Sequence, residues 1–137
     1  MTALTPSNQP SLNVPMPKIL IVDDNPAIGR SLAKVLQFEH YDTMVALRGL
    51  EAIDYARCNR YAAVFVDIHL PDLNGLVVSQ KLRELLGPEI PIIVVSGDTS
   101  MEVINALPHV GATYFFSKPL NISYMLARLK EWIGEKH

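Results

Sequence analysis

The chain has 137 residues, the length of one ordinary domain, and its 49% hydrophobic and 19% charged residues exclude an intrinsically disordered protein. Its formal net charge of −2 gives no reason to expect direct nucleic-acid binding. No apolar stretch approaches the roughly 20 residues that span a bilayer, and residues 1–17 lack the features of a secretory signal. We therefore expect no membrane insertion and a cytoplasmic location, which the single cysteine, Cys58, also fits.

The first 17 residues differ in composition from the rest of the chain. They carry no charged side chain and contain four prolines, Pro6, Pro10, Pro15 and Pro17. A polar segment rich in proline predicts a flexible or polyproline-like tail. We expect this tail at residues 1–17 and one domain at residues 18–137. The tail is either a native extension or a linker from a longer chain.

Five strands and five helices alternate after the tail. The predicted strands are residues 19–22, 42–46, 62–66, 92–95 and 112–116. The predicted helices are residues 26–36, 49–58, 75–86, 99–107 and 122–133. Strands that are apolar along their whole length are typical of strands buried on both faces. The alternation therefore predicts an α/β fold, with a parallel sheet covered by helices on both sides.

Apolar residues at helical spacing indicate which side of each helix faces the core. The expected core positions are Ile28, Leu32, Val35, Leu36, Leu50, Ile53, Val78, Leu82, Leu85, Leu86, Ile122, Met125, Leu126, Leu129 and Ile133. In the fourth helix, Pro108 is expected to end or distort the element because proline lacks the backbone N–H.

Polar side chains follow four of the five predicted strands. They are Asp23 and Asp24 after the first strand, Asp67 after the third, Ser96 after the fourth and Lys118 after the last. The carboxyl ends of parallel strands meet at one edge of a sheet, where ligands collect. Each residue alone is more often a helix cap, a loop serine or a surface lysine. The expected position of all five residues at one edge of the sheet predicts a functional site there.

Three carboxylates at one edge repel one another, and one takes up a proton unless a cation lies between them. Mg²⁺ satisfies this need because it binds through one or two carboxylates together with phosphate oxygens. Lys118 supplies a fixed positive charge, and Ser96 supplies a hydroxyl donor. A carboxylate nucleophile with a metal and two donors is typical of phosphoryl transfer, in which positioning and charge neutralisation supply most of the catalysis.

The ordered set Asp23-Asp24, Asp67, Ser96-Gly97 and Lys118-Pro119 resembles the signature of the receiver domain of two-component response regulators. The resemblance covers residues 18–133. It implies a flavodoxin-like fold, in which a single doubly wound parallel sheet has five strands in the order 2-1-3-4-5 with helices on both faces. The activity that it implies is slow autodephosphorylation and autophosphorylation from phosphodonors, and not that of a metabolic enzyme.

The resemblance also assigns a role to each residue of the metal site. Asp67 would accept a phosphoryl group from the phosphohistidine of a sensor histidine kinase or of a histidine phosphotransfer protein. Asp24 would bind Mg²⁺ or Mn²⁺ directly, and Asp23 would act largely through a coordinated water. Asp67 and the backbone carbonyl of His69 would complete the protein ligands. The His69 side chain is instead expected to line the mouth of the site.

The remaining implied roles concern the response to phosphorylation. Ser96 and Lys118 would contact the phosphoryl group, and Phe115 would turn inward as the switch residue. Phe115 lacks the hydroxyl of the tyrosine that is common at this position. The Lys118–Pro119 peptide is expected to be cis. The surface of the last two helices and the last strand would then bind a downstream protein or a second copy of the chain.

Other functions remain as alternatives. The chain is either a stand-alone switch or a receiver domain cut from a larger response regulator or a hybrid histidine kinase, and a scaffold that binds partners without phosphorylation also stays open. A nucleotide or flavin binder is disfavoured, because Asp23-Asp24-Asn25-Pro26 replaces the glycine-rich phosphate loop of such proteins. An aspartyl phosphatase is disfavoured because no second acid lies two residues after Asp67.

Overall fold

The computed structural model describes residues 16–134, so most of the predicted tail and the last three residues lie outside the described part of the chain. Five strands and five α-helices alternate along the described residues, and one short 3-10 turn at Pro108–Val110 precedes the last strand. The strands are β1 (Lys18–Val22), β2 (Asp42–Ala46), β3 (Ala63–Val66), β4 (Ile92–Ser96) and β5 (Tyr114–Ser117). The helices are α1 (Pro26–Phe38), α2 (Gly49–Cys58), α3 (Gly75–Leu86), α4 (Met101–Ala106) and α5 (Ile122–Ile133).

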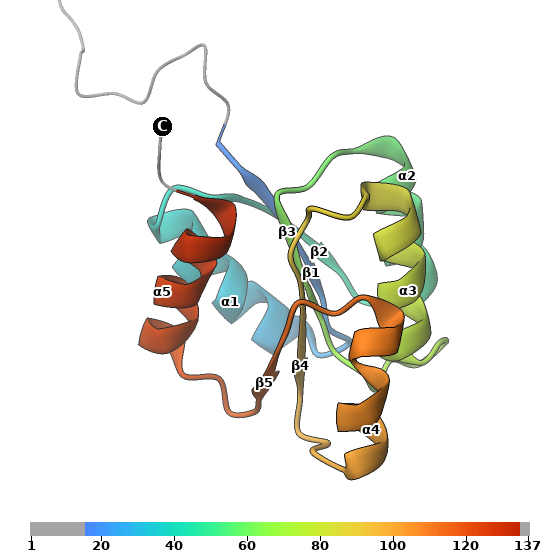
Figure 1. Cartoon of the computed structure of the whole chain (residues 1–137). Helices are drawn as coiled ribbons and strands as arrows, with labels where there is room; N and C mark the ends of the chain where they lie inside the picture. The colour runs from blue at the N-terminus through green and yellow to red at the C-terminus, as the bar shows by residue number, and fades with distance from the viewer. Residues whose placement is uncertain (1–15, 135–137) are drawn as a thin grey trace, which may run out of the picture.

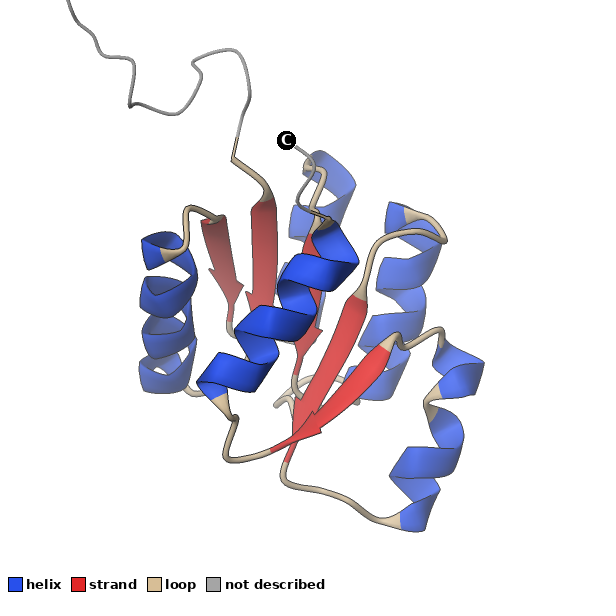
Figure 2. Cartoon of the chain, turned by 60° about the vertical axis from the view of Figure 1, so that its left-hand side comes forward, coloured by secondary structure: helices blue, strands red, loops and turns tan. Residues whose placement is uncertain are grey.

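The five strands form one parallel sheet in the order β2-β1-β3-β4-β5, which confirms the predicted topology. Helices α1 and α5 cover one face of the sheet, and α2, α3 and α4 lie on the other (Figure 1). Figure 2 shows the strands running between these two layers, with their carboxyl ends on one side of the molecule. Strand β3 is therefore central, and its end lies between the ends of β1 and β4.

Each strand contributes to two cores because successive side chains point to opposite faces of a sheet. In β1, Ile19 and Ile21 pack in the core under α1 and α5. Leu20 and Val22 pack in the other core, under α2 and α3. All four are at most 1% exposed, which explains why an uninterrupted apolar run, rather than an alternating one, marks these strands.

Four predicted core positions near the helix ends were wrong. Ile28, Leu50, Leu85 and Ile122 are 41%, 58%, 40% and 38% exposed, respectively. Each of these residues lies in the first or last turn of its helix, where less of the sheet lies beneath the side chain. In the middle of the helices small residues approach the sheet, and these are Gly29, Ala33, Ala52, Ala56 and Ser79. A spacing argument built on large apolar residues does not find them.

The fourth helix is shorter than predicted. It ends at Ala106 rather than Leu107, and Pro108 opens the 3-10 turn that follows. Proline fits the first turn of a helix, where no N–H is needed, and breaks the interior. The expected effect of Pro108 is therefore confirmed.

The start of α3 lies directly against the backbone of the Asp67 loop. The Gly75 amide donates a hydrogen bond to the Ile68 carbonyl at 2.7 Å. A Cβ atom at Gly75 would overlap the Asp67 carbonyl oxygen and the Cα atom of Ile68. Only glycine permits this close approach, which fixes the backbone that carries Asp67.

We predict that Gly75→Ala lowers the free energy of unfolding by about 2 kcal/mol, because the added methyl group forces α3 and the Asp67 backbone apart. Chemical denaturation measures the change. Gly97→Ala is the matched control, since a Cβ atom there has no neighbour within 4 Å. Equal stability of the two variants would contradict the prediction.

Candidate functional site: an acidic cluster at the carboxyl edge of the sheet

Three aspartates gather at the carboxyl ends of β1 and β3. Asp23 and Asp67 are buried, with 5% and 8% of their surface exposed, whereas Asp24 is exposed. One carboxylate oxygen from each residue lies within 4.8 Å of the other two. The structure thus brings together the three acids that the sequence placed at this edge, and their oxygens form a donor set suited to a hard divalent cation.

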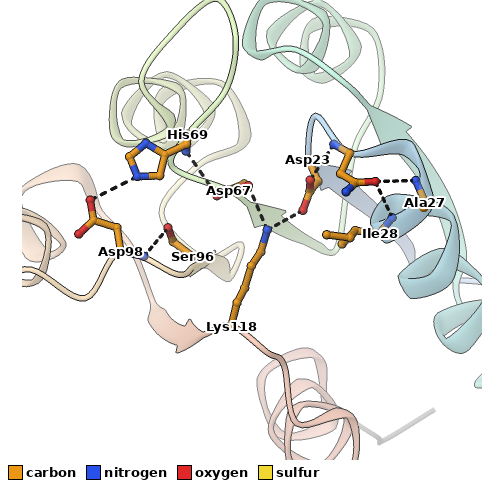
Figure 3. Close-up of polar contacts among 9 residues, drawn as sticks. Asp23, Ala27, Ile28, Asp67, His69, Ser96, Asp98 and Lys118 are labelled. Carbon is orange, nitrogen blue, oxygen red and sulfur yellow. Dashed lines mark hydrogen bonds and ion pairs between the residues drawn. The ribbon is translucent and has the colours of Figure 1, made fainter.

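Lys118 bridges the two buried carboxylates. Its Nζ atom lies 3.1 Å from Oδ2 of Asp23 and 3.1 Å from Oδ2 of Asp67 (Figure 3). The residue follows β5, and its peptide bond to Pro119 is cis, as expected. One ammonium group therefore neutralises charge from two strands of the sheet.

The electrostatics of Lys118 follow from this position. Partial burial by itself lowers the pKa of the ammonium group, but hydrogen bonds to Asp67 and Asp23 outweigh that effect and raise the pKa above its ordinary value. Lys118 therefore remains charged throughout the physiological pH range. The stabilisation that it gives is present below the ordinary lysine pKa and is lost only as the pH rises through the raised value.

The backbone holds the site residues in register beyond the strand ends. The Asp67 amide donates to the Val22 carbonyl at 2.9 Å, and the Lys118 amide donates to the Ser96 carbonyl at 3.0 Å. These bonds continue the sheet ladder past β3 and β5. The sheet hydrogen bonds therefore hold the backbone that carries the side chains of the acidic edge.

The turn after β1 fixes Asp23 and starts α1. Oδ1 of Asp23 accepts a hydrogen bond from the Asn25 amide at 2.9 Å. Oδ1 of Asn25 in turn accepts from the amides of Ala27 and Ile28 and so caps the helix (Figure 3). The sequence predicted this cap, and the structure adds that the same turn positions the carboxylate.

Ser96 and His69 meet at Asp98, a residue that the sequence analysis did not assign to the site. The buried Ser96 accepts a hydrogen bond at Oγ from the Asp98 amide at 3.1 Å. The His69 ring lies 3.3 Å from Asp98 through Nε2, while its amide donates to Oδ1 of Asp67 at 3.3 Å (Figure 3). Hydrogen bonds from Ser100 and, less strongly, from His69 hold the pKa of Asp98 below its usual value. The only local signal for Asp98 was a short turn into Ser100.

Phe115 lies apart from the acids. Its side chain is half-buried and packs against a cluster formed by Ile68, Val94 and Val103, on the face that carries α4. Ile68 directly follows Asp67 in the chain, so this cluster connects the acidic edge to α4. The predicted role of Phe115 as a switch residue stays a prediction.

The family model of the response regulator receiver domain matches residues 19–130. The chain belongs to this family. The receiver domain is 36% identical over 113 residues to the response regulator MprA of Mycobacterium sp. strain KMS, an alignment that covers 82% of this chain and 49% of MprA. The chain thus spans about half the length of the curated relatives that it matches.

Solved receiver structures agree with this fold. A CheY-like receiver domain protein from Methanospirillum hungatei JF-1 has a TM-score of 0.83 at 31% identity, covering 86% of this chain and 94% of that one. A response regulator from Burkholderia pseudomallei, solved with a phosphorylated aspartic acid, a calcium ion and citrate, has a TM-score of 0.77 at 29% identity. That likeness covers 82% of this chain and 66% of the other.

Among residues 16–134, no helix is long and apolar enough to cross a membrane.

We predict that Lys118→Met strengthens Mg²⁺ binding about tenfold, because Lys118 competes with a divalent cation for Asp23 and Asp67. Isothermal titration calorimetry measures the affinity. Lys130→Met is the control, since it removes the same charge at a distant pair, 3.5 Å from Glu39. Equal Mg²⁺ affinity of the two variants would refute the competition.

Proposed function

We propose that this receiver domain is a signalling switch in which Asp67 accepts a phosphoryl group from the phosphohistidine of a sensor histidine kinase or of a histidine phosphotransfer protein. The observation that carries the proposal is the geometry around Asp67. Asp67 directly follows the central strand β3, Asp23 and Asp24 follow the neighbouring strand β1, and Ser96 is the last residue of β4 on the other side. A carboxylate in this place is flanked by a candidate metal site on one side and a hydroxyl on the other.

Receiver domains bind Mg²⁺ at an acidic pocket, and the residues present here fit that ion. We propose that Asp23, Asp24, Asp67 and the backbone carbonyl of His69 hold Mg²⁺ or Mn²⁺, since all offer the oxygen donors that these ions prefer. When bound, the ion neutralises negative charge on the phosphoryl oxygens.

The protein groups have separable roles in the transfer. One carboxylate oxygen of Asp67 forms a bond to phosphorus while the P–N bond of the phosphohistidine breaks and its electron pair stays on the imidazole nitrogen. The ammonium of Lys118 already lies 3.1 Å from Asp67, so it can exchange a carboxylate partner for a phosphoryl oxygen. Ser96 supplies a hydroxyl donor from the next strand.

The output surface is proposed to comprise α4, β5 and α5. Large hydrophobic residues are exposed there, with Met101 68%, Tyr124 48% and Ile122 38% accessible. Phosphorylation would alter this surface through Phe115, for a downstream protein or for a second copy of the chain. The cytoplasmic location stays a prediction, as does the choice between a stand-alone switch and one domain of a larger regulator or hybrid kinase.

Incubation with Mg²⁺ and acetyl phosphate should add one phosphoryl group to the protein, detected by intact mass and removed by hydroxylamine, as expected of an acyl phosphate. Asp67→Asn should remove the adduct completely. Asp42→Asn is the matched control, because Asp42 is the first residue of β2 and lies at the amino ends of the strands, away from the acidic cluster. This variant should be modified like the wild type.

Chelation of Mg²⁺ should abolish the modification. An adduct that persists in Asp67→Asn would place the acceptor elsewhere. A wild-type protein that takes up neither phosphate nor beryllofluoride would refute the switch and favour a scaffold that acts without phosphorylation.

A further inference from the structure

The loop between β3 and α3 contacts the start of α2 through one side chain. Oδ1 of Asp72 accepts a hydrogen bond from the Gly49 amide at 2.8 Å, and Oδ2 accepts from the Leu50 amide at 2.9 Å. The two partners are separated from Asp72 by 23 and 22 positions in the chain. Both oxygens of one carboxylate thus bind the first turn of a distant helix.

Helix α2 depends on this contact because it has no side-chain cap at its own N-cap position. Arg48 occupies that position and makes no capping hydrogen bond. The first amides of a helix have no intrahelical partner, and a carboxylate also interacts favourably with the positive end of the helix dipole. Consistently, the backbone hydrogen bonds from Leu50 and then Gly49 lower the pKa of Asp72 below its ordinary value.

The same loop carries two groups of the acidic site. It begins after β3 with Asp67 and includes His69, whose carbonyl is a proposed metal ligand. The loop is closed on itself, since His69 and Asn74 form an isolated antiparallel bridge and the Gly75 amide donates to the Ile68 carbonyl. In so short a closed loop, a displacement of Asp72 moves the backbone at His69.

We propose that Asp72 is a positioning residue for the metal site: by holding the first turn of α2, it fixes the loop that presents the His69 carbonyl beside Asp67. The proposal rests on the proposed function, because it concerns the same Mg²⁺ site. The hydrogen bonds of Asp72 to the first turn of α2 also couple this helix to the metal site. Binding at the acidic edge is transmitted through the Asp72 carboxylate to the amides of Gly49 and Leu50.

Glu51 provides a matched control for a purely structural cap. Its Oε1 atom accepts a hydrogen bond from the Leu47 amide at 2.7 Å, also at the start of α2. Like Asp72, it is a carboxylate that accepts a hydrogen bond from the backbone there. Glu51, however, belongs to α2 itself and bonds to Leu47 and Tyr55 rather than to the β3–α3 loop, so its loss weakens the helix start without releasing the metal site.

The test compares wild type, Asp72→Ala and Glu51→Ala in Mg²⁺ titrations followed by ¹⁵N–¹H NMR, with thermal melting alongside. Asp72→Ala should weaken Mg²⁺ binding about tenfold, the scale typical of lost support behind a metal ligand. Glu51→Ala should lower the melting temperature but leave the affinity unchanged. In the wild type the Gly49 and Leu50 amides should shift with Mg²⁺, and in Asp72→Ala this response should disappear.

Equal Mg²⁺ affinity of Asp72→Ala and Glu51→Ala would overturn the proposal, whether both are weakened or neither is. If Asp72→Ala does not fold, Asp72→Asn replaces it. Asparagine keeps one acceptor oxygen, so a smaller loss of affinity, about threefold, is expected, and wild-type affinity would overturn the proposal.

The role of Asp72 and the phosphorylation switch can fail separately. A wild-type protein that is phosphorylated normally while Asp72→Ala binds Mg²⁺ as tightly as the wild type refutes the role of Asp72 alone. A wild-type protein that is never phosphorylated, but whose Mg²⁺ affinity depends on Asp72, refutes the phosphorylation switch alone. A wild-type protein that does not bind Mg²⁺ refutes both.

Discussion

Charge balance between Lys118 and two buried carboxylates is the constraint on which the acidic edge depends. Asp23 and Asp67 directly follow two adjacent strands and are almost inaccessible to water, so their negative charges need a cation close by. The ammonium of Lys118, which follows a third strand, β5, meets this need at 3.1 Å from each carboxylate. The arrangement also leaves the site ready to change partners, since a divalent ion or a phosphoryl group alters which of these charges must be paired.

The fold supplies this arrangement through backbone geometry. Parallel strands deliver Asp23, Asp67, Ser96 and Lys118 to one edge, and ladder hydrogen bonds continue past the strand ends to fix them. Gly75 brings α3 against the Asp67 backbone. Main-chain contacts therefore fix the backbone on which the acids lie.

The sequence predicted the sheet and the acidic cluster because both depend on local patterns. Apolar runs that end in Asp67 or in Ser96 mark buried strands and place their ends together. The same reasoning failed at Ile28 and Leu50, because spacing alone does not say where a helix extends past the sheet. It also left out Asp72, whose partners lie 23 and 22 residues away, and the contact of Asp98 with His69, which spans 29 residues; neither contact leaves a local signal.

A crystal structure of the protein with Mg²⁺ and beryllofluoride tests the central claim most directly. We predict that beryllium is bonded to a carboxylate oxygen of Asp67 and that a metal ion contacts Asp23 and Asp24. Lys118 and Ser96 should contact the fluorides, with Lys118 no longer bridging the two carboxylates. Beryllofluoride bound away from Asp67, or a metal ion that does not touch the acidic cluster, would contradict it.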